Sequence, residues 1–187
     1  KKLMSSKKFS EGKIYVTGCI GSALVVAGIK EKKIAGIYYK NVLDSMIASN
    51  YKLHKILARN NIMIKTDVSG FGLAIHLHNL FLRNNFLNGA EIYLDNIPLF
   101  KGARLALQRS VASSLNESNK SFISKYLEIK NTNNELINSI YDPQTAGGFI
   151  FICRDNEQQA IKELKENNIK CTHIGNIIKN KKRITII

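Results

Sequence analysis

The sequence lacks tryptophan, has only two prolines, and contains no apolar run of the roughly 20 residues that cross a bilayer. Its first segment, Lys1 to Gly12, is polar and basic and has no apolar stretch of the kind found in secretory signals. Cysteine is rare: Cys19, Cys153 and Cys171 are too far apart for a zinc knuckle, and their odd number argues against a disulfide framework. We therefore expect a soluble protein of a reducing compartment, the cytoplasm, with no membrane partner.

Acidic residues are also scarce, at 14 against 28 Lys and Arg, which gives a formal net charge of +14. Such a charge suits a polyanionic partner, and a non-catalytic basic nucleic-acid-binding module is one alternative function. The densest basic clusters, however, lie near the two ends, where a solvated charge run is the simpler interpretation, and no recognisable nucleic-acid-binding module accompanies them. We do not expect nucleic acid to be the main partner. The clusters are Lys1, Lys2, Lys7, Lys8 and Lys179, Lys181, Lys182, Arg183.

The length of 187 residues allows one domain with a real core but not two ordinary domains. Hydrophobic residues make up 44% and charged residues 22%, the balance of a globular protein rather than a disordered one. Because residue 1 is not Met and no domain-starting signal precedes residue 13, we interpret residues 1–12 as a lead-in from a missing N-terminal domain. Residues 13–187 form the expected domain.

Apolar and turn-forming residues divide the chain into alternating strands and helices. The patterns predict strands at 13–17, 62–66, 90–94, 126–129, 149–153, 171–178 and 183–187. They predict helices at 22–29, 41–60, 73–83, 98–112, 133–140 and 156–167, a polar loop at 113–121, and a hairpin turn at Asn180 and Lys181. Since strands and helices alternate without strict βαβ regularity, we expect an α+β fold with mixed α/β layers, in which helices flank a mixed β-sheet.

The segment from Lys65 to Gly72 carries the clearest candidate for chemistry. Asp67 follows a predicted strand, and Gly70 and Gly72 then open a helix. A side chain at this position projects beyond the sheet edge, and glycines let backbone N–H groups approach a phosphate. A carboxylate there can hold Mg²⁺, which shares its remaining positions with water and phosphate oxygens. The alternative from the residues alone is that Asp67 only forms the turn.

A second unusual turn runs from Asp142 to Gly148. Pro143 fixes its own φ and keeps Asp142 out of the helical region. Gly147 and Gly148 permit backbone conformations that other residues avoid. This turn leads into a short apolar run and serves either to support packing or to contact a ligand.

Together these segments resemble the selenophosphate synthetase family. The stretch from Thr66 to Leu73, followed by His76 and Leu77, resembles the family motif TDVTGFGLLGHL. The turn Asp142 to Gly148 resembles DPQTSGG, and Ile97 to Ala103 is similar to IPLLPGA. Three further fragments align in order: Val16 to Gly21 with LTKPLGTG, Ser45-Met46 plus Asn50 with SMxxLN, and Gly89 to Asp95 with the strand before IPLL. The resemblance implies the C-terminal domain fold of the aminoimidazole ribonucleotide (AIR) synthase-like superfamily.

The resemblance also implies a function and a site. The family makes selenophosphate from selenide, ATP and water and releases AMP and phosphate, so the implied cofactors are Mg²⁺ and ATP. It implies that Asp67 is a metal ligand, and Gly70 and Gly72, which let a phosphate approach the backbone, are the candidate cofactor-binding residues. No catalytic residue is implied within this chain, because the family's reactive Cys or selenocysteine belongs to an N-terminal domain. That domain is the implied partner, a homodimer is implied at full length, and the chain alone should be inactive. Another ATP-dependent enzyme of the superfamily is the alternative.

Some positions depart from the family pattern. Ser69 and Ala146 replace Thr and Ser, and Ala74-Ile75 stands in place of Leu-Gly. The loop that carries PGGT in the family reads Ser114 to Asn119 here, without a glycine pair. His76 matches a family histidine, for which we expect a packing or hydrogen-bonding role. His76 and His78 are two apart on a predicted helix, so they cannot chelate one zinc ion.

Overall fold

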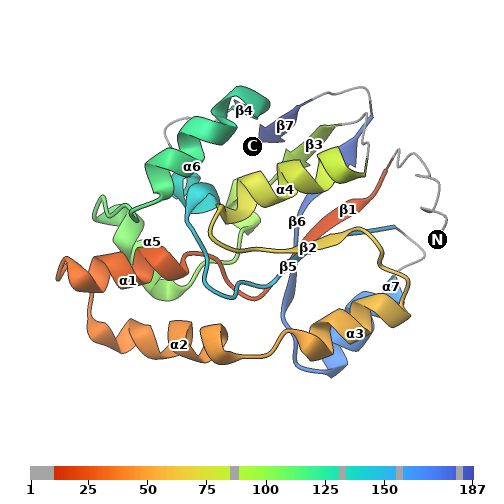
Figure 1. Cartoon of the computed structure of the whole chain (residues 1–187), viewed down its shortest axis with the longest axis horizontal. Helices are drawn as coiled ribbons and strands as arrows, with labels where there is room; N and C mark the ends of the chain where they lie inside the picture. The colour runs from red at the N-terminus through yellow and green to blue at the C-terminus, as the bar shows by residue number, and fades with distance from the viewer. Residues whose placement is uncertain (1–10, 85–88, 131–133, 155–157, 180–182) are drawn as a thin grey trace.

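The computed structural model of the chain describes residues 11–84, 89–130, 134–154, 158–179 and 183–187 (Figure 1). Of the expected lead-in, residues 1–10 lie outside the described part. Seven strands form one sheet in the order β2-β5-β1-β6-β3-β7-β4. The strands are β1 Lys13–Thr17, β2 Lys65–Asp67, β3 Gly89–Ile92, β4 Leu127–Ile129, β5 Phe149–Cys153, β6 Cys171–Ile178 and β7 Ile184–Ile186. Most neighbours are antiparallel, while β7 runs parallel to both β3 and β4. The predicted mixed sheet is therefore confirmed.

Helices cover both faces of this sheet. Figure 1 shows α4 and α6 on one side of it and α3 and α7 on the other. The α-helices are α1 Ser22–Lys30, α2 Tyr39–Ile47, α3 Tyr51–Arg59, α4 Gly72–Arg83, α5 Lys101–Gln108, α6 Asn116–Ile123 and α7 Gln158–Glu166. Short 3₁₀ segments are η1 Gly36–Tyr38, η2 Leu94–Asn96, η3 Ser124–Tyr126 and η4 Glu135–Tyr141.

The alternation of side chains along β5 separates two hydrophobic cores. Ile150 and Ile152 belong to the larger core, which packs beneath α1, α4 and α5. Phe151 points to the opposite face and joins a smaller core with Leu57 of α3 and Leu164 of α7. Successive side chains of a strand point to opposite faces of the sheet. The run 149–153 is apolar throughout because both faces of β5 are buried.

Two predicted helices begin or end elsewhere in the structure. The predicted helix 41–60 is wrong as one unit, because Ala48 is extended and separates α2 from α3. At this break the Ser49 hydroxyl accepts the N–H of Tyr51, and such local side-chain bonds compete with the helix. The helix predicted at 98–112 begins only at Lys101, because residues 98–100 pair with Ile20 through two backbone hydrogen bonds.

The polar loop predicted at 113–121 is also wrong, since α6 begins within it. The buried positions of α6 are Asn116, Asn119 and Ile123, at helical spacing, so its inward face is largely polar and escapes a search for apolar periodicity. The segment predicted as a helix at 133–140 is the 3₁₀ segment η4. Asn180 and Lys181 lie outside the described residues, but β6 and β7 both flank β3 and do not pair in a hairpin.

The turn 142–148 joins distant parts of the fold. One carboxylate oxygen of Asp142 accepts the N–H groups of Ala23 and Leu24 at 3.2 and 3.3 Å. The side-chain oxygen of Gln144 accepts the N–H groups of Gly21 and Ser22 at 3.0 and 3.2 Å. Four N–H groups at the start of α1, which have no partner within the helix, are thereby satisfied by one remote turn. The N–H of Gln144 donates to the carbonyl of Ser69 at 3.1 Å, so the same turn also holds the segment after β2.

The glycines of this turn are required for space rather than for an unusual φ. The residue with positive φ is Ala146, at 49°, whereas Gly147 and Gly148 lie against other backbone. A Cβ atom at Gly148 would stand 2.0 Å from the carbonyl oxygen of Thr17. The sequence-based interpretation of these two glycines is corrected accordingly.

Replacing Gly148 by Ala should therefore destabilise the domain by about 3 kcal/mol, because the turn and β1 must separate to admit the methyl group. Gly36→Ala is the matched control, since nothing lies within 4 Å of a Cβ at Gly36. Its free energy of unfolding should stay within about 0.5 kcal/mol of the parent. Urea unfolding followed by circular dichroism measures both variants, and equal stability of the two would contradict the close approach.

The burial of Asp142 should make stability depend on pH. Its side chain is fully buried, and this burial raises the pKa of the carboxyl to about 6, although the hydrogen bonds from Leu24, Gln144 and Ala23 and the nearby Ser113 hydroxyl favour the charged form. The folded protein therefore holds this proton more tightly than the unfolded chain does between about pH 4 and pH 6. The resulting stabilisation is fully present below pH 4 and is lost as the pH rises through 6.

Asp142→Asn removes this titration. Its free energy of unfolding, relative to that of the parent, should therefore rise by about 3 kcal/mol as the pH increases from 4 to 7. The measurement is the difference in unfolding free energy between variant and parent at several pH values. A difference that stays constant over this range would show that Asp142 titrates normally.

Candidate functional site

Asp67 is the last residue of β2, an edge strand that pairs on one side with β5. Its backbone lies opposite Phe149, and its side chain is exposed. Within the described ranges, no side chain or backbone group forms a hydrogen bond or salt bridge with the Asp67 carboxylate. The carboxylate therefore does not form a hydrogen bond within the adjoining turn and is available to a ligand.

The backbone after Asp67 is held firmly in place. The N–H of Val68 donates to the carbonyl of Gly148 at 2.9 Å. The carbonyl of Ser69 accepts the N–H of Gln144 and also that of Gly72, at 3.1 and 3.0 Å. The turn 142–148 thus fixes the position from which the Asp67 side chain projects.

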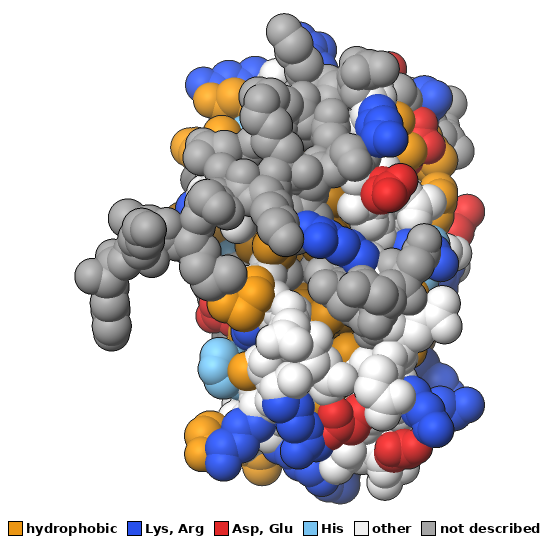
Figure 2. All heavy atoms as spheres, turned by 90° about the vertical axis from the view of Figure 1, so that its right-hand side faces the viewer, with side chains coloured by type: hydrophobic (Ala, Val, Ile, Leu, Met, Phe, Trp, Pro, Cys, Tyr) orange, Lys and Arg blue, Asp and Glu red, His pale blue; other side chains and the backbone are white. Residues whose placement is uncertain are grey.

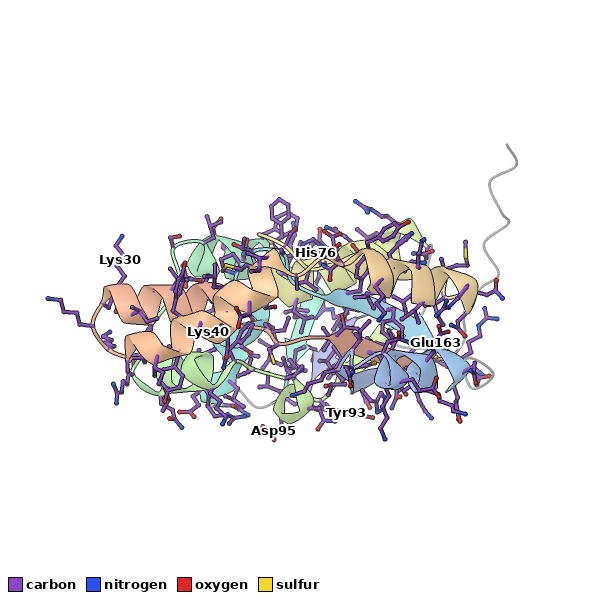
Figure 3. All side chains as sticks on the ribbon, turned by 90° about the horizontal axis from the view of Figure 1, so that it is seen from below. Lys30, Lys40, His76, Tyr93, Asp95 and Glu163 are labelled. Atoms are coloured by element: carbon purple, nitrogen blue, oxygen red, sulfur yellow. The ribbon has the colours of Figure 1, made fainter. Side chains whose placement is uncertain are left out.

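His76, which is labelled in Figure 3, belongs to α4 and contacts the same segment through Ser69. Its Nε2 accepts the N–H of Ser69 at 3.1 Å and lies 3.1 Å from the Ser69 hydroxyl. Burial lowers the pKa of His76, the charge of Asp67 opposes this shift, and Arg83 adds to it. A lowered pKa favours the neutral ring, whose unprotonated nitrogen can accept the amide N–H. The hydrogen-bonding role expected for His76 is confirmed.

The two glycines of the segment have different surroundings. A Cβ at Gly70 would meet nothing within 4 Å, so its backbone faces open space. Gly72 has a φ of +75°, and a Cβ there would stand 2.8 Å from the carbonyl carbon of Tyr141. Gly72 is therefore required for packing against the start of the turn. Cofactor binding at Gly70 and Gly72 stays a prediction.

Sequence reasoning missed Asn119, which connects the two glycine-bearing segments. Its side-chain amide donates to the carbonyl of Gly70 at 3.1 Å and to that of Tyr141 at 2.9 Å. Asn119 belongs to α6, the stretch that replaces the family's PGGT loop. The signal that could have found it is the spacing of Asn116 and Asn119, three residues apart, which places both amides on one helix face.

Neither the histidines nor the cysteines form another centre. His78 stacks on Tyr126 with ring centroids 4.2 Å apart, while His76 faces Ser69, so the two rings do not converge. Burial raises the pKa of the Cys19 thiol, which disfavours a reactive thiolate, and Cys153 is a buried core residue. In the described part of the chain, no group of three His, Cys, Asp or Glu residues could hold a metal ion. Asp67 can thus supply one ligand but not a complete metal site.

Among the described residues, no helix combines the length and the apolar character needed to span a bilayer.

Comparison with known proteins agrees with the expected resemblance. A protein of Carboxydothermus hydrogenoformans named selenide, water dikinase is 27% identical over 175 residues, which cover 92% of this chain and 50% of that protein. The chain spans about half the length of the curated relatives it matches first. The resemblance to the selenophosphate synthetase family that the sequence motifs indicated is confirmed.

Solved structures share the fold at low identity. Thiamine-monophosphate kinase of Stenotrophomonas maltophilia has a TM-score of 0.64 and 15% identity, covering 96% of this chain and 51% of that chain. The hydrogenase maturation protein HypE, solved in complex with ATP, has a TM-score of 0.55 and 13% identity, covering 93% and 44%. Identities this low show the fold alone.

The match to a family is the broadest of these findings. The family described as AIR synthase related protein, C-terminal domain, matches residues 20–187, which include every motif segment except the start of the first. With the mixed sheet, the exposed Asp67 at its edge and the turn that fixes it, the chain belongs to the C-terminal domain family of AIR synthase related proteins.

Proposed function

We propose that this chain is the C-terminal domain of an ATP-dependent selenophosphate synthetase, in which Asp67 is a ligand of the Mg²⁺ that accompanies ATP. The observation that carries the proposal is the exposed Asp67 carboxylate, which lies at a sheet edge and has no partner among the described residues. The names of the curated relatives, and their length of about twice this chain, support a site completed by an N-terminal domain. On this proposal the chain is inactive alone.

The residues present suit a shared magnesium site. Mg²⁺ is held by oxygen atoms at short distance, usually one or two carboxylates together with water and phosphate oxygens. A single exposed carboxylate on a rigid segment can contribute to such a set, whereas the described residues do not provide a complete one. When bound, the ion would neutralise charge on the phosphate groups during phosphoryl transfer.

The remaining residues of the site position Asp67 rather than react. The Gln144 N–H holds the Ser69 carbonyl, and His76 holds the Ser69 N–H. Together these bonds fix the N–H and the carbonyl of Ser69, two residues after Asp67. A carboxylate that is already positioned loses little conformational freedom when it binds a ligand, which favours binding. Gly70, with open space beside it, allows a phosphate group to approach the backbone.

The alternatives predict different measurements. Another ATP-dependent enzyme of the superfamily would release ADP rather than AMP with its own substrate. A basic nucleic-acid-binding module would need an extended basic surface. Figure 2 shows Lys and Arg interspersed with acidic side chains on the face that includes α3 and α7, where Arg59 pairs with Glu163. In the described part of this face, acidic side chains thus interrupt the basic ones.

In the full-length protein, Asp67→Asn should lower selenide-dependent AMP formation from ATP at least about a hundredfold, because the neutral amide stabilises the metal and the phosphate charge poorly. The variant should fold normally, since Asp67 is exposed and satisfies no buried group. The measurement is AMP release with circular dichroism as the folding check.

Asp95→Asn is the matched control. Asp95 is exposed in η2 and lies on the opposite side from His76 in the view of Figure 3. Its removal changes the net charge equally but should leave AMP release unchanged. Full turnover by Asp67→Asn, or an equal loss in both variants, would remove Asp67 from the mechanism.

A further inference from the structure

Three large hydrophobic side chains are exposed close to Asp67 in the folded chain. Phe71 is 60% exposed, Phe122 55% and Leu115 48%. Phe71 directly precedes α4, whereas Leu115 directly precedes α6 and Phe122 lies in its last turn. We call these three residues the apolar patch. A single exposed hydrophobic residue is normal, but a group of them marks a site of interaction.

One hydrogen bond brings the members of the apolar patch together. The side-chain amide of Asn119 donates to the carbonyl of Gly70 at 3.1 Å, and Gly70 is the residue before Phe71. Leu115 lies four residues before Asn119 and Phe122 three residues after it, so both are its neighbours on the surface of α6. Leu115 and Phe122 are two helical turns apart and therefore lie on the same side of α6.

The apolar patch has a fixed position relative to Asp67. The amide of Asn119 also donates to the carbonyl of Tyr141 at 2.9 Å, which ties α6 to the start of the turn that holds Ser69. The carbonyl of Gly70, three residues after Asp67, is held by α6 directly. A body that docks on the patch is thereby placed with respect to the Asp67 carboxylate.

The metal proposed at Asp67 indicates which body this is. Mg²⁺ binds oxygen atoms at about 2.0–2.1 Å, so a second protein ligand of the same ion comes within about 4 Å of the Asp67 carboxylate. Within the described ranges the chain does not provide a complete set of ligands. The part of the protein that supplies them must therefore cover the surface beside Asp67, where the apolar patch lies.

The comparisons indicate where these ligands come from. The chain spans about half of its curated relatives and belongs to a C-terminal domain family, so the other half of such a protein is an N-terminal domain of similar size. We propose that the N-terminal domain of the full-length protein docks on the apolar patch. The docking role rests on the proposed metal function of Asp67, because that function requires a second domain at this place.

The patch has the composition and size of the centre of such an interface. Phenylalanine is enriched in protein interfaces, and the residues that dominate binding cluster near their centres. Interfaces between domains of one chain bury about 600–1,500 Å². A covered aromatic side chain contributes about 150–250 Å². Phe71 and Phe122 thus account for a substantial part of the area that the docking requires.

Hydroxyl-radical footprinting, which oxidises exposed side chains, tests the docking surface in the 187-residue chain and in the full-length protein. The oxidation rates of Phe71 and Phe122 should be at least about fivefold lower in the full-length protein, because the centre of an interface excludes water. Leu82 is the matched control. It is 62% exposed but lies at the opposite end of α4 from Phe71, and its rate should be the same in both proteins.

A double variant of the full-length protein separates docking from other causes of protection. Phe71→Ser with Phe122→Ser should raise the oxidation rate of Leu115 to that of the 187-residue chain, because the N-terminal domain no longer docks. Leu82→Ser with Met63→Ser removes two side chains of similar exposure outside the patch and should leave Leu115 protected. Circular dichroism checks the folding of both variants.

The docking and the metal function can fail separately. Protection of the patch together with undiminished AMP release by Asp67→Asn would support the docking and refute the metal role. Equal oxidation rates of Phe71 and Phe122 in the two proteins would overturn the docking, even if Asp67→Asn abolishes AMP release. Protection that appears in the 187-residue chain as its concentration is raised would also overturn it, because the patch would then bind a second copy of this chain.

Discussion

The buried turn that begins at Asp142 holds the domain together, and the site depends on it. Asp142 and Gln144 satisfy the first N–H groups of α1, which otherwise would be buried without partners. A buried donor without a partner costs about 1–3 kcal/mol, so the loss of several at once would be a large part of a domain's stability. Because the same turn binds Ser69 and Val68 through backbone atoms, the placement of Asp67 is linked to the capping of a helix on a different part of the sheet.

The cost of this arrangement is a carboxylate removed from water. Burial favours the protonated form of Asp142, and the hydrogen bonds from α1 favour the charged form, with burial the larger effect. The Ser113 hydroxyl, Ser139 hydroxyl and Tyr141 hydroxyl are also buried, without partners that meet hydrogen-bond geometry. This concentration of buried polar groups lies next to the candidate site, where proteins commonly accept local instability for the sake of function.

Much of the fold could be predicted from local patterns. The central strands at 13–17 and 149–153 were predicted at their observed bounds, because their apolar residues are bounded by glycines and turns. The failures have identifiable causes. The inward face of α6 is made of asparagines, so no apolar period marks it. Strand neighbours were not predictable either: β6 and β7 follow each other in the sequence, but β3 lies between them because pairing is decided by the whole sheet.

For the candidate site, the sequence predicted which segments matter but not how they meet. Asp67 is exposed at the sheet edge, although it is the last residue of β2 and not, as predicted, the residue after a strand at 62–66, and its metal role stays a prediction. The bonds that join the turn 142–148 to Val68 and Ser69 carried no signal at all, because these residues lie far apart in the sequence and meet only in the folded chain. Long-range contacts of this kind depend on the tertiary fold, and no local pattern encodes them.

The parallel pairing of β7 with both β3 and β4 has a consequence for how the sheet is made. Among the described strands, β4 has β7 as its sole neighbour, although β7 is more than 50 residues later in the chain. During synthesis the ribosome therefore releases β3 and β4 before the strand that joins them exists. Until residues 184–186 emerge, the Leu127–Ile129 segment has an unpaired edge, which is the kind of surface that chaperones bind and that nascent chains aggregate through.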